Sequence, residues 1–327
     1  MGIKIANAVL AVVFGVLGAV VLFWVLDKLS ALGGKKGEER VKPYLYLLPA
    51  LAAISLFLLY PAITTIQASF ANADTSKYVG LQNYTQLLGN RDFQTAILNN
   101  FLWILVVPAS VVALGLLVAT LADRLSPGAE KLSKTIIFLP MAISMAGAGT
   151  IWALIYAFKP AGTPQTGLLN AIVTAFGGQP QTWLQFTNFK FNVLLLMVVY
   201  IWTQVGYAMV LLSSAIKAVP EDTIEAGRID GAGEKRIFFS IIVPQVWPTV
   251  VTVFITVLIG VLKVFDIVYV MTNGQFDTNV VGNAFFSQLF INMDNGKAAA
   301  IVVMLMIVIV PIMVYQVRQF RLQEAQR

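Results

Sequence analysis

The sequence predicts an all-α, polytopic membrane protein with about seven transmembrane helices. Of its 327 residues, 58% are hydrophobic and 12% are charged, whereas roughly a quarter of the residues of an ordinary soluble domain carry a charge. Seven apolar runs of about 20 residues follow one another along the chain. Each run is long enough to cross a hydrocarbon layer of ~30 Å as a helix that rises ~1.5 Å per residue.

The apolar runs also place the expected spans, because their ends mark where each helix leaves the membrane. In chain order, the spans are Ile5–Leu26, Tyr44–Ala68, Ala96–Leu121, Thr135–Phe158, Phe191–Ile216, Thr249–Met271 and Ala298–Val317. The Gly- and Lys-rich stretch Ser30–Arg40 separates the first two spans. We expect this stretch to be a flexible linker.

The first span has an alternative interpretation as a cleaved signal peptide, since the small residues Ala31, Gly33 and Gly34 follow it. However, its apolar run exceeds the usual 7–15 residues of a signal peptide, and the positive charges come after the run instead of before it. We therefore expect a retained N-terminal transmembrane helix.

The distribution of positive charge predicts the orientation of the spans. Alternate loops and the C-terminal tail on one side hold 15 of the 22 Lys and Arg residues, the opposite side holds six, and Lys263 lies inside a span. Lys and Arg residues are retained on the cytoplasmic side. This count predicts an N-terminus outside the cell and a C-terminus in the cytoplasm.

The absence of Cys and His limits the chemistry of the chain. Disulfides, thiolate or imidazole metal sites and Cys–His or Ser–His–Asp nucleophiles are excluded. We expect no catalytic residues and no metal site in this chain.

The loop Val219–Pro244 between the fifth and sixth spans is the most informative segment of the sequence. Pro220 suits the first position of a helix, and Asp230-Gly231 favours its end because glycine adopts the left-handed conformation. Residues 232–242 can then form a second short helix before Pro244. The loop therefore predicts a helical hairpin in the cytoplasm.

The apolar residues of this hairpin are too numerous for an idle solvated loop. They are Ile224, Ile229, Ile237, Phe238, Ile241 and Ile242. We expect them to rest in a groove on another protein, although packing against the chain's own bundle explains their periodicity equally well.

The hairpin also resembles a known signature. Glu225-Ala226, then Gly231 and finally Ile241-x-x-Pro244 are similar to the Glu-Ala-Ala, Gly and Ile-x-Leu-Pro positions of ABC importer permeases. Gly227 stands where that signature has Ala, and Val243 where it has Leu. The resemblance implies an ATPase-docking set: Glu225, Ala226, Gly227, Arg228, Asp230, Gly231, Ala232 and Glu234.

Further motifs extend the resemblance over about residues 44–318. They are Gly80-Leu81-x-Asn83-Tyr84, Phe138-Leu139-Pro140, Gly167-Leu168-Leu169-Asn170 and Thr272-Asn273-Gly274. Together they resemble the binding-protein-dependent, maltose-type sugar permeases. The resemblance implies a six-helix permease core at residues 44–318 with the coupling loop 219–244, an extra N-terminal helix and linker at 1–43, and a cytoplasmic tail at 319–327.

The same resemblance implies a transmembrane permease subunit in the bacterial cytoplasmic membrane. Such a subunit imports a sugar of the maltose, trehalose or alpha-glucoside class and performs no chemistry itself. The implied partners are a second permease, two cytoplasmic ABC ATPase subunits and an extracytoplasmic sugar-binding protein. ATP and Mg are expected in the ATPase subunits, and nucleic acid is not an expected partner.

Candidate substrate residues come from two sources. Polar and aromatic groups inside the spans suggest Trp202, Gln204, Tyr207, Lys263 and Asp266, because buried polar groups in lipid usually face a cavity or a partner. Alignment to the maltose-type permeases implies the set Met141, Met145, Trp202, Val205, Gly206, Met209, Val257 and Val261. Several of these positions are polar in that family, so maltose itself is not implied.

Lys263 and Asp266 allow a second function. Residues three apart share one face of a helix, so the two charges are expected to neutralise each other as a structural pair. The alternative is an ion- or proton-coupled secondary carrier in which they form a relay. A membrane enzyme is a weaker alternative, because the chain has no His or Cys to act as base or nucleophile.

Overall fold

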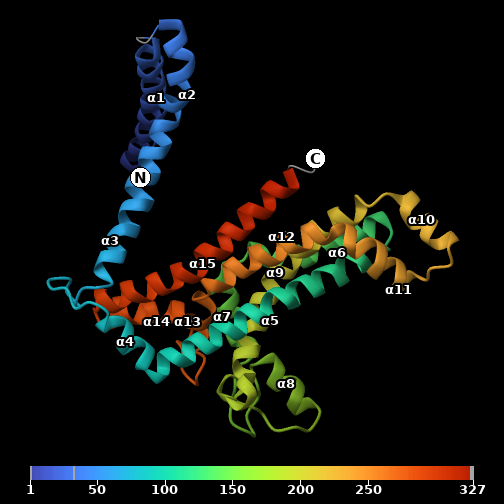
Figure 1. The fold of residues 1–327 in the computed structure, drawn as a ribbon. Coiled ribbons are helices and arrows are strands. Elements are labelled where there is room, and N and C mark those ends of the chain that lie inside the picture. The colour runs from blue at the N-terminus through green and yellow to red at the C-terminus, as the bar shows by residue number, and fades with distance from the viewer. Residues whose placement is uncertain (1, 32–33, 325–327) are drawn as a thin grey trace. The chain divides into compact units, whose positions relative to one another are not determined.

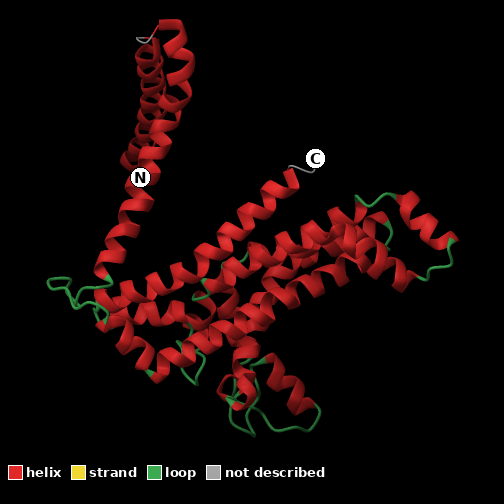
Figure 2. Ribbon diagram, in the orientation of Figure 1, coloured by secondary structure: helices red, strands yellow, loops and turns green. Residues whose placement is uncertain are grey.

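The computed structural model describes residues 2–31 and 34–324, and these residues are mostly helical (Figures 1 and 2). Their one isolated β-bridge joins Ala71 and Tyr78. The chain divides into two compact units, Met1–Gln67 and Ala68–Arg327.

The first unit is a pair of apolar helices. It contains α1 (Gly2–Ala31), α2 (Gly34–Ile54), the π-helical segment η1 (Ser55–Leu59) and α3 (Tyr60–Ala68), which ends at the boundary between the units. The helix α2 begins inside the expected linker, whose residues 32 and 33 lie outside the described part of the chain. Lys42 Nζ lies 2.7 Å from Asp27 Oδ1, and Phe23 stacks on Tyr46, so α1 and α2 hold together near their shared turn.

The second unit is a bundle of long helices with short helices at both ends (Figure 1). Its elements are α4 (Gln82–Gly89), α5 (Arg91–Ala122), α6 (Pro127–Phe138), η2 (Leu139–Ala142), α7 (Met145–Ile155), α8 (Leu168–Ala175), η3 (Trp183–Gln185), η4 (Asn188–Lys190), α9 (Phe191–Lys217), α10 (Glu221–Ile229), α11 (Glu234–Ile237), η5 (Phe238–Ile242), α12 (Val243–Leu262), α13 (Asp266–Met271), α14 (Val281–Phe286), η6 (Ser287–Ile291) and α15 (Asn295–Glu324).

The core of this unit lies where α5 packs along α9. Trp103 of α5 is fully buried and meets Tyr200 of α9 edge to face, with ring centroids 6.0 Å apart. At Gly115 the two backbones approach so closely that an added Cβ would lie 2.7 Å from the Cβ of Ala208. Small residues permit such close approach, which membrane helices use for van der Waals packing. This contact fixes α5 and α9 as the framework of the bundle.

The described helices include six that are long and apolar enough to cross a membrane, or seven if a bent pair counts as one span. The bent pair corresponds to the span predicted at Thr135–Phe158, and its bend was not predicted from the sequence. Here α6 and η2 meet α7 at an angle of 104°. The Ser144 hydroxyl accepts a hydrogen bond from the Gly147 N–H and thereby caps a new helix start.

The span predicted at Thr249–Met271 is also interrupted. The helix α12 ends at Leu262, α13 begins at Asp266, and the backbone of Phe265 between them is not helical. Neither Gly nor Pro occupies residues 263–265. The sequence therefore carries no ordinary helix-breaking signal at this point.

Two of the family motifs organise the loops at the end of the bundle remote from α10. The buried Asn83 side chain donates to the carbonyl oxygens of Ser69 and Ala71. The buried Asn170 side chain likewise donates to the carbonyls of Ala157 and Gln181. Buried backbone carbonyls need partners, so these amides hold the loops in place.

Candidate functional site

The predicted hairpin forms at one end of the bundle, where α10 and α11 extend beyond α5 and α6 (Figure 1). Pro220 was expected at the first position of the helix, but it is the residue before α10. Glu221 and Asp222 occupy the first turn of the helix. Negative side chains at this end stabilise the helix because its free N–H groups carry positive partial charge. The hairpin thus begins with an acidic, solvent-facing turn.

The turn after α10 closes as the sequence indicated. Gly231 has a φ of +82°, the Ala232 N–H donates to the Gly227 carbonyl, and the Gly231 N–H donates to the Arg228 carbonyl. These two bonds make the Schellman motif, which satisfies free carbonyls at a helix end. The prediction that Asp230-Gly231 ends the helix is confirmed.

The inner face of the hairpin packs against the chain itself. Ile237 is 1% exposed, and Ile224 and Ile242 pack against the core of the bundle. A Cβ at Gly227 would lie 2.6 Å from Cδ1 of Ile241. The glycine that departs from the family signature therefore makes room for this isoleucine.

The outer face of the hairpin is mainly polar. Glu225, Ala226 and Asp230 are exposed, and Ile229 is 86% exposed. Five of the six apolar residues of the hairpin are buried or half-buried in this chain, so packing against its own bundle, the alternative interpretation, accounts for much of their apolar character. Ile229 is the apolar exception, and its neighbours along the chain, Arg228 and Asp230, are charged.

An ion-pair chain crosses the base of the hairpin. Arg228 Nη2 lies 3.1 Å from Glu234 Oε1, and Arg124 Nη2 lies 3.7 Å from Glu234 Oε2. All three side chains are more than half exposed, so each pair contributes at most ~1 kcal/mol. Two residues of the expected docking set thus hold the hairpin closed and connect it to the turn after α5.

The second helix of the hairpin does not stop before Pro244, contrary to the prediction. Instead α11 continues through the π-helical turn η5 into α12, giving one helical stretch from Glu234 to Leu262. Proline lacks an N–H and its ring clashes with the carbonyl four residues before it. A wider π turn just ahead of Pro244 is consistent with accommodating both effects. The hairpin is therefore continuous with the sixth span.

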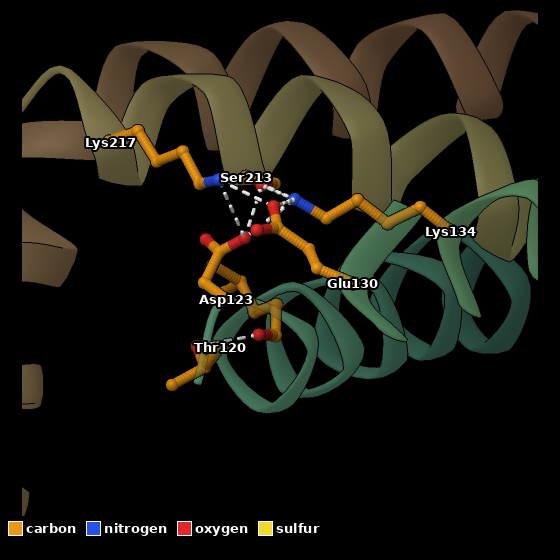
Figure 3. Close-up of polar contacts among 7 residues, drawn as sticks. Thr120, Asp123, Glu130, Lys134, Ser213 and Lys217 are labelled. Atoms are coloured by element: carbon orange, nitrogen blue, oxygen red, sulfur yellow. Dashed lines mark hydrogen bonds and ion pairs between the residues drawn. The ribbon is translucent and has the colours of Figure 1, made fainter. Parts of the chain in front are cut away.

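A charged cluster joins α5, α6 and α9 beside the hairpin (Figure 3). Lys134 Nζ on α6 lies 2.6 Å from both Asp123 Oδ1 and Glu130 Oε1, and 2.5 Å from the Ser213 hydroxyl on α9. The Ser213 hydroxyl donates to Asp123 Oδ1 over 2.7 Å. The sequence reasoning did not single out this cluster, because its members come from three separate segments.

The same cluster reaches the start of the hairpin. Lys217, the last residue of α9, forms an ion pair with Glu130 and lies 3.8 Å from Asp123 Oδ1. Two positive and two negative side chains make the cluster neutral, as expected for charges that are largely removed from water. Because Lys217 lies three residues before Pro220, the cluster anchors the base of α10 to α5 and α6.

The predicted substrate residues lie on neighbouring elements. Trp202 packs edge to face on Trp152 of α7 with ring centroids 5.8 Å apart, and the Thr203 hydroxyl donates to the sulfur of Met145 over 3.7 Å. Gly206 lets α9 approach α6, since an added Cβ would lie 2.4 Å from the Ile137 carbonyl oxygen. The structure therefore brings η2, α7 and α9 together.

The exposure of the predicted substrate residues divides them into two groups. Met209, Val257, Val261 and the backbone of Gly206 are buried. Met141, Lys263 and Asp266 are exposed, while Met145, Trp202, Gln204, Val205 and Tyr207 are half-buried. Only the exposed and half-buried residues offer surface to a solute in this conformation.

Lys263 and Asp266 do not share a helix. Lys263 follows the end of α12 and Asp266 begins α13, and the ion pairs among the described residues do not include one between them. The prediction that helical spacing would pair them is therefore wrong. Both side chains remain exposed on the surface of the chain.

Comparisons with known proteins identify a family and relatives that match most of this chain. Residues 111–322 match the family described as the binding-protein-dependent transport system inner membrane component. The alpha-glucoside transport system permease protein AglF of Rhizobium meliloti is 45% identical, with 96% of this chain and 97% of AglF covered. The osmoprotective compounds uptake permease protein GgtC of Synechocystis sp. is 42% identical, with 86% of this chain and 100% of GgtC covered.

Solved structures share the fold. A chain of a bacterial ABC transporter involved in the import of the acidic polysaccharide alginate superposes with a TM-score of 0.74 at 20% identity, covering 88% of this chain and 98% of that chain. A second structure, of an alginate transporter in complex with an alginate pentasaccharide-bound periplasmic protein, gives a TM-score of 0.71 at 20% identity and covers 85% and 94% of the two chains. The architecture of the bundle is therefore that of an ABC importer permease.

Proposed function

The chain belongs to the family of binding-protein-dependent transport system inner membrane components, and from this premise we propose that it docks an ATPase subunit through α10. It is a multi-pass ABC importer permease, a transport subunit and not an enzyme. We propose that it forms one half of a sugar pathway with a second permease. Two ATPase subunits, which hold the ATP and Mg, and an extracytoplasmic sugar-binding protein complete the proposed assembly.

The observation that carries the docking proposal is the outer face of the hairpin. The Schellman turn and the Arg228–Glu234 ion pair hold α10 in one position, while Glu225 and Ile229 remain exposed. A preformed helix with one apolar side chain among charged ones suits a groove of opposite charge on another protein. Preorganisation lowers the entropy cost of such docking.

The orientation of the chain is part of the proposal. Within the second unit, α5 and α15 begin at the end of the bundle remote from α10 (Figure 1). Lys and Arg residues gather on the hairpin side, and the cytoplasmic side retains such residues. We therefore place the hairpin and the C-terminus in the cytoplasm and the N-terminus outside.

The alpha-glucoside class is the proposed cargo. It is taken from the relative AglF, whose similarity extends over nearly the whole of both chains. The partly exposed Trp202, Gln204 and Tyr207 offer aromatic surface and hydrogen-bonding groups, which sugar sites combine. The secondary-carrier alternative has no comparable support, because family membership accounts for the hairpin and a Lys263–Asp266 pair is not formed.

The charged cluster supplies a route from the ATPase to the spans. Docking at α10 acts on Lys217 at the end of α9, and Lys217 pairs with Glu130 of α6. The helix α6 leads through η2 to the bent span that carries Met141 and Met145. Rigid-body movement of the hairpin would therefore change the position of the proposed substrate region.

A charge reversal at Glu225 tests the docking proposal. In the complete transporter, Glu225→Lys should reduce ATP-driven uptake of trehalose at least tenfold and release the ATPase subunit during purification, because an exposed docking carboxylate becomes an ammonium group. Lys131→Glu is the matched control, since Lys131 is exposed on α6 and takes no part in the ion pairs of the described residues. Normal uptake and normal ATPase retention in Glu225→Lys would exclude docking through α10.

A further inference from the structure

Four aromatic rings form a continuous row, with Phe265 just before α13 and the other three on α13, α14 and η6. Phe265 stacks on Tyr269 with ring centroids 5.0 Å apart, and both rings contact Phe286 at 5.0 and 4.9 Å. Phe286 in turn lies 4.7 Å from Phe290. The four residues, which we call the aromatic row, come from two segments separated by the loop at residues 272–280.

The aromatic row is buried on one side and open on the other. Phe265 and Phe286 are half-buried, whereas Tyr269 is 39% exposed and Phe290 is 54% exposed. Packing of Phe265 and Phe286 explains how α13 and α14 hold together. It does not explain why the two outer rings remain uncovered.

Two charged residues lie beside the first ring of the aromatic row, and they indicate which kind of environment the exposed side of the row faces. Lys263 and Asp266, both exposed, flank Phe265 at the break between α12 and α13. Lys263 lies fourteen residues after Thr249, the expected start of the sixth span, which places it about 21 Å into a hydrocarbon layer of ~30 Å. Charges at this depth are costly in lipid and face a protein interior or a water-filled cavity.

We propose that the aromatic row, together with Lys263 and Asp266, forms a sugar-binding wall of the translocation pathway in which pyranose rings lie on the faces of Tyr269 and Phe290. This inference rests on the proposed function and adds the aromatic row, which lies outside the predicted substrate set, to Lys263 and Asp266, which belong to it. The flat C–H face of a pyranose buries apolar surface on an aromatic ring, while its hydroxyl groups bond to charged and polar side chains. A row of rings offers successive positions of similar affinity.

The chemistry of the row favours a sugar over a lipid chain or a helix of the partner permease. A lipid chain would leave Lys263 and Asp266 without water or hydrogen-bond partners. A packed helix would cover all the rings and would need small or apolar residues opposite the charges. A hydrated sugar satisfies both the charges and the ring faces.

Cysteine accessibility in the complete transporter tests the proposal directly, because the chain has no cysteine of its own. Tyr269→Cys and Phe290→Cys should react with a membrane-impermeant maleimide, and trehalose with its binding protein should slow the reaction at least threefold. Phe14→Cys on α1, 68% exposed, is the control for a lipid-facing ring and should not react. Tyr78→Cys in an exposed loop, 78% exposed, should react at the same rate with and without sugar.

Uptake measurements provide the second test, with the binding protein saturated so that its own affinity does not limit the rate. Tyr269→Leu and Phe290→Leu keep apolar volume but remove the ring face, and each should reduce maximal trehalose uptake at least fivefold. Tyr269→Phe and Phe290→Tyr keep the ring and should retain normal uptake. Phe14→Leu should have no effect.

The proposal is overturned if neither cysteine reacts, if sugar does not protect them, or if the leucine variants transport trehalose at the normal rate. Failure of the proposed function itself gives a different result. In that case the unmodified transporter takes up no trehalose or maltose, or Glu225→Lys keeps its ATPase and its uptake. The two hypotheses are therefore tested separately.

Discussion

Gly206 has a packing role that the alignment did not indicate. The resemblance implied a sugar contact at this position, but the structure places it where α9 crosses α6. An added Cβ would lie 2.4 Å from the Ile137 carbonyl oxygen and 2.6 Å from the Phe138 Cα. These are backbone atoms, which cannot move aside as the end of a side chain can. The immediate reason for a glycine here is therefore helix packing.

Gly206→Ala should consequently destabilise the protein without changing which sugars it carries. Overpacking a tight helix contact costs about 1–3 kcal/mol, and thermal unfolding of the purified complex measures the loss. Gly128→Ala on α6 is the matched control, because nothing lies within 4 Å of the added Cβ. That control should be neutral or slightly stabilising, since alanine favours helix by ~1 kcal/mol over glycine. Equal stability of both variants would contradict the packing role.

At the scale of elements, the charged cluster holds the ends of three helices together. Lys134 contacts Asp123, Glu130 and Ser213, so this one side chain connects α6 to the end of α5 and to α9 (Figure 3). Removing one charge leaves its partners partly buried and unpaired, which costs more than removing a matched pair. If the cluster stabilises the fold, removing one charge should therefore cost more stability than removing a positive and a negative charge together.

Lys134→Met alone should therefore destabilise the protein by about 2 kcal/mol, less than the ~3–5 kcal/mol of a fully buried pair. Adding Asp123→Asn to form the double variant should recover a large part of this loss, because the cluster becomes neutral again. A double-mutant cycle of thermal stability measures the coupling, with Lys131→Met as the control on the same helix. Additive effects of the two substitutions would show that Lys134 and Asp123 do not act together.

The elements also show what the sequence can and cannot predict. Apolar runs located all the long helices, and Asp230-Gly231 located the end of α10, because hydrophobic length and left-handed glycine are local signals. The bend before α7 was missed although Pro140 and the capping residue Ser144 are local signals for it, whereas the break after Leu262 has no Gly or Pro to indicate it. The charged cluster was missed because Asp123, Lys134 and Ser213 meet only after α5, α6 and α9 have assembled.

At the scale of the whole molecule, the proposed ATPase-docking surface and the proposed sugar-binding surfaces lie on different elements. The inner face of the hairpin packs on the bundle through Ile224 and Ile237, and α11 runs without interruption into α12. The outer face presents Glu225 and Ile229 for docking. The proposed sugar surfaces lie on other elements, η2, α7, α9, α13, α14 and η6. A subunit built this way can change its cargo while keeping the same ATPase.

Cross-linking at Ile229 tests the central claim most directly, because this side chain is the most exposed apolar group on α10 and the chain has no other cysteine. Ile229→Cys carrying a short photoreactive label, in membranes that contain the complete transporter, should form a covalent adduct with the ATPase subunit. Phe239→Cys serves as the comparison for a label placed outside α10, because the Phe239 side chain on η5 is 68% exposed. The account predicts strong ATPase cross-linking from Ile229 that changes in yield when ATP is added, whereas cross-links to lipid or to the permeases alone would contradict it.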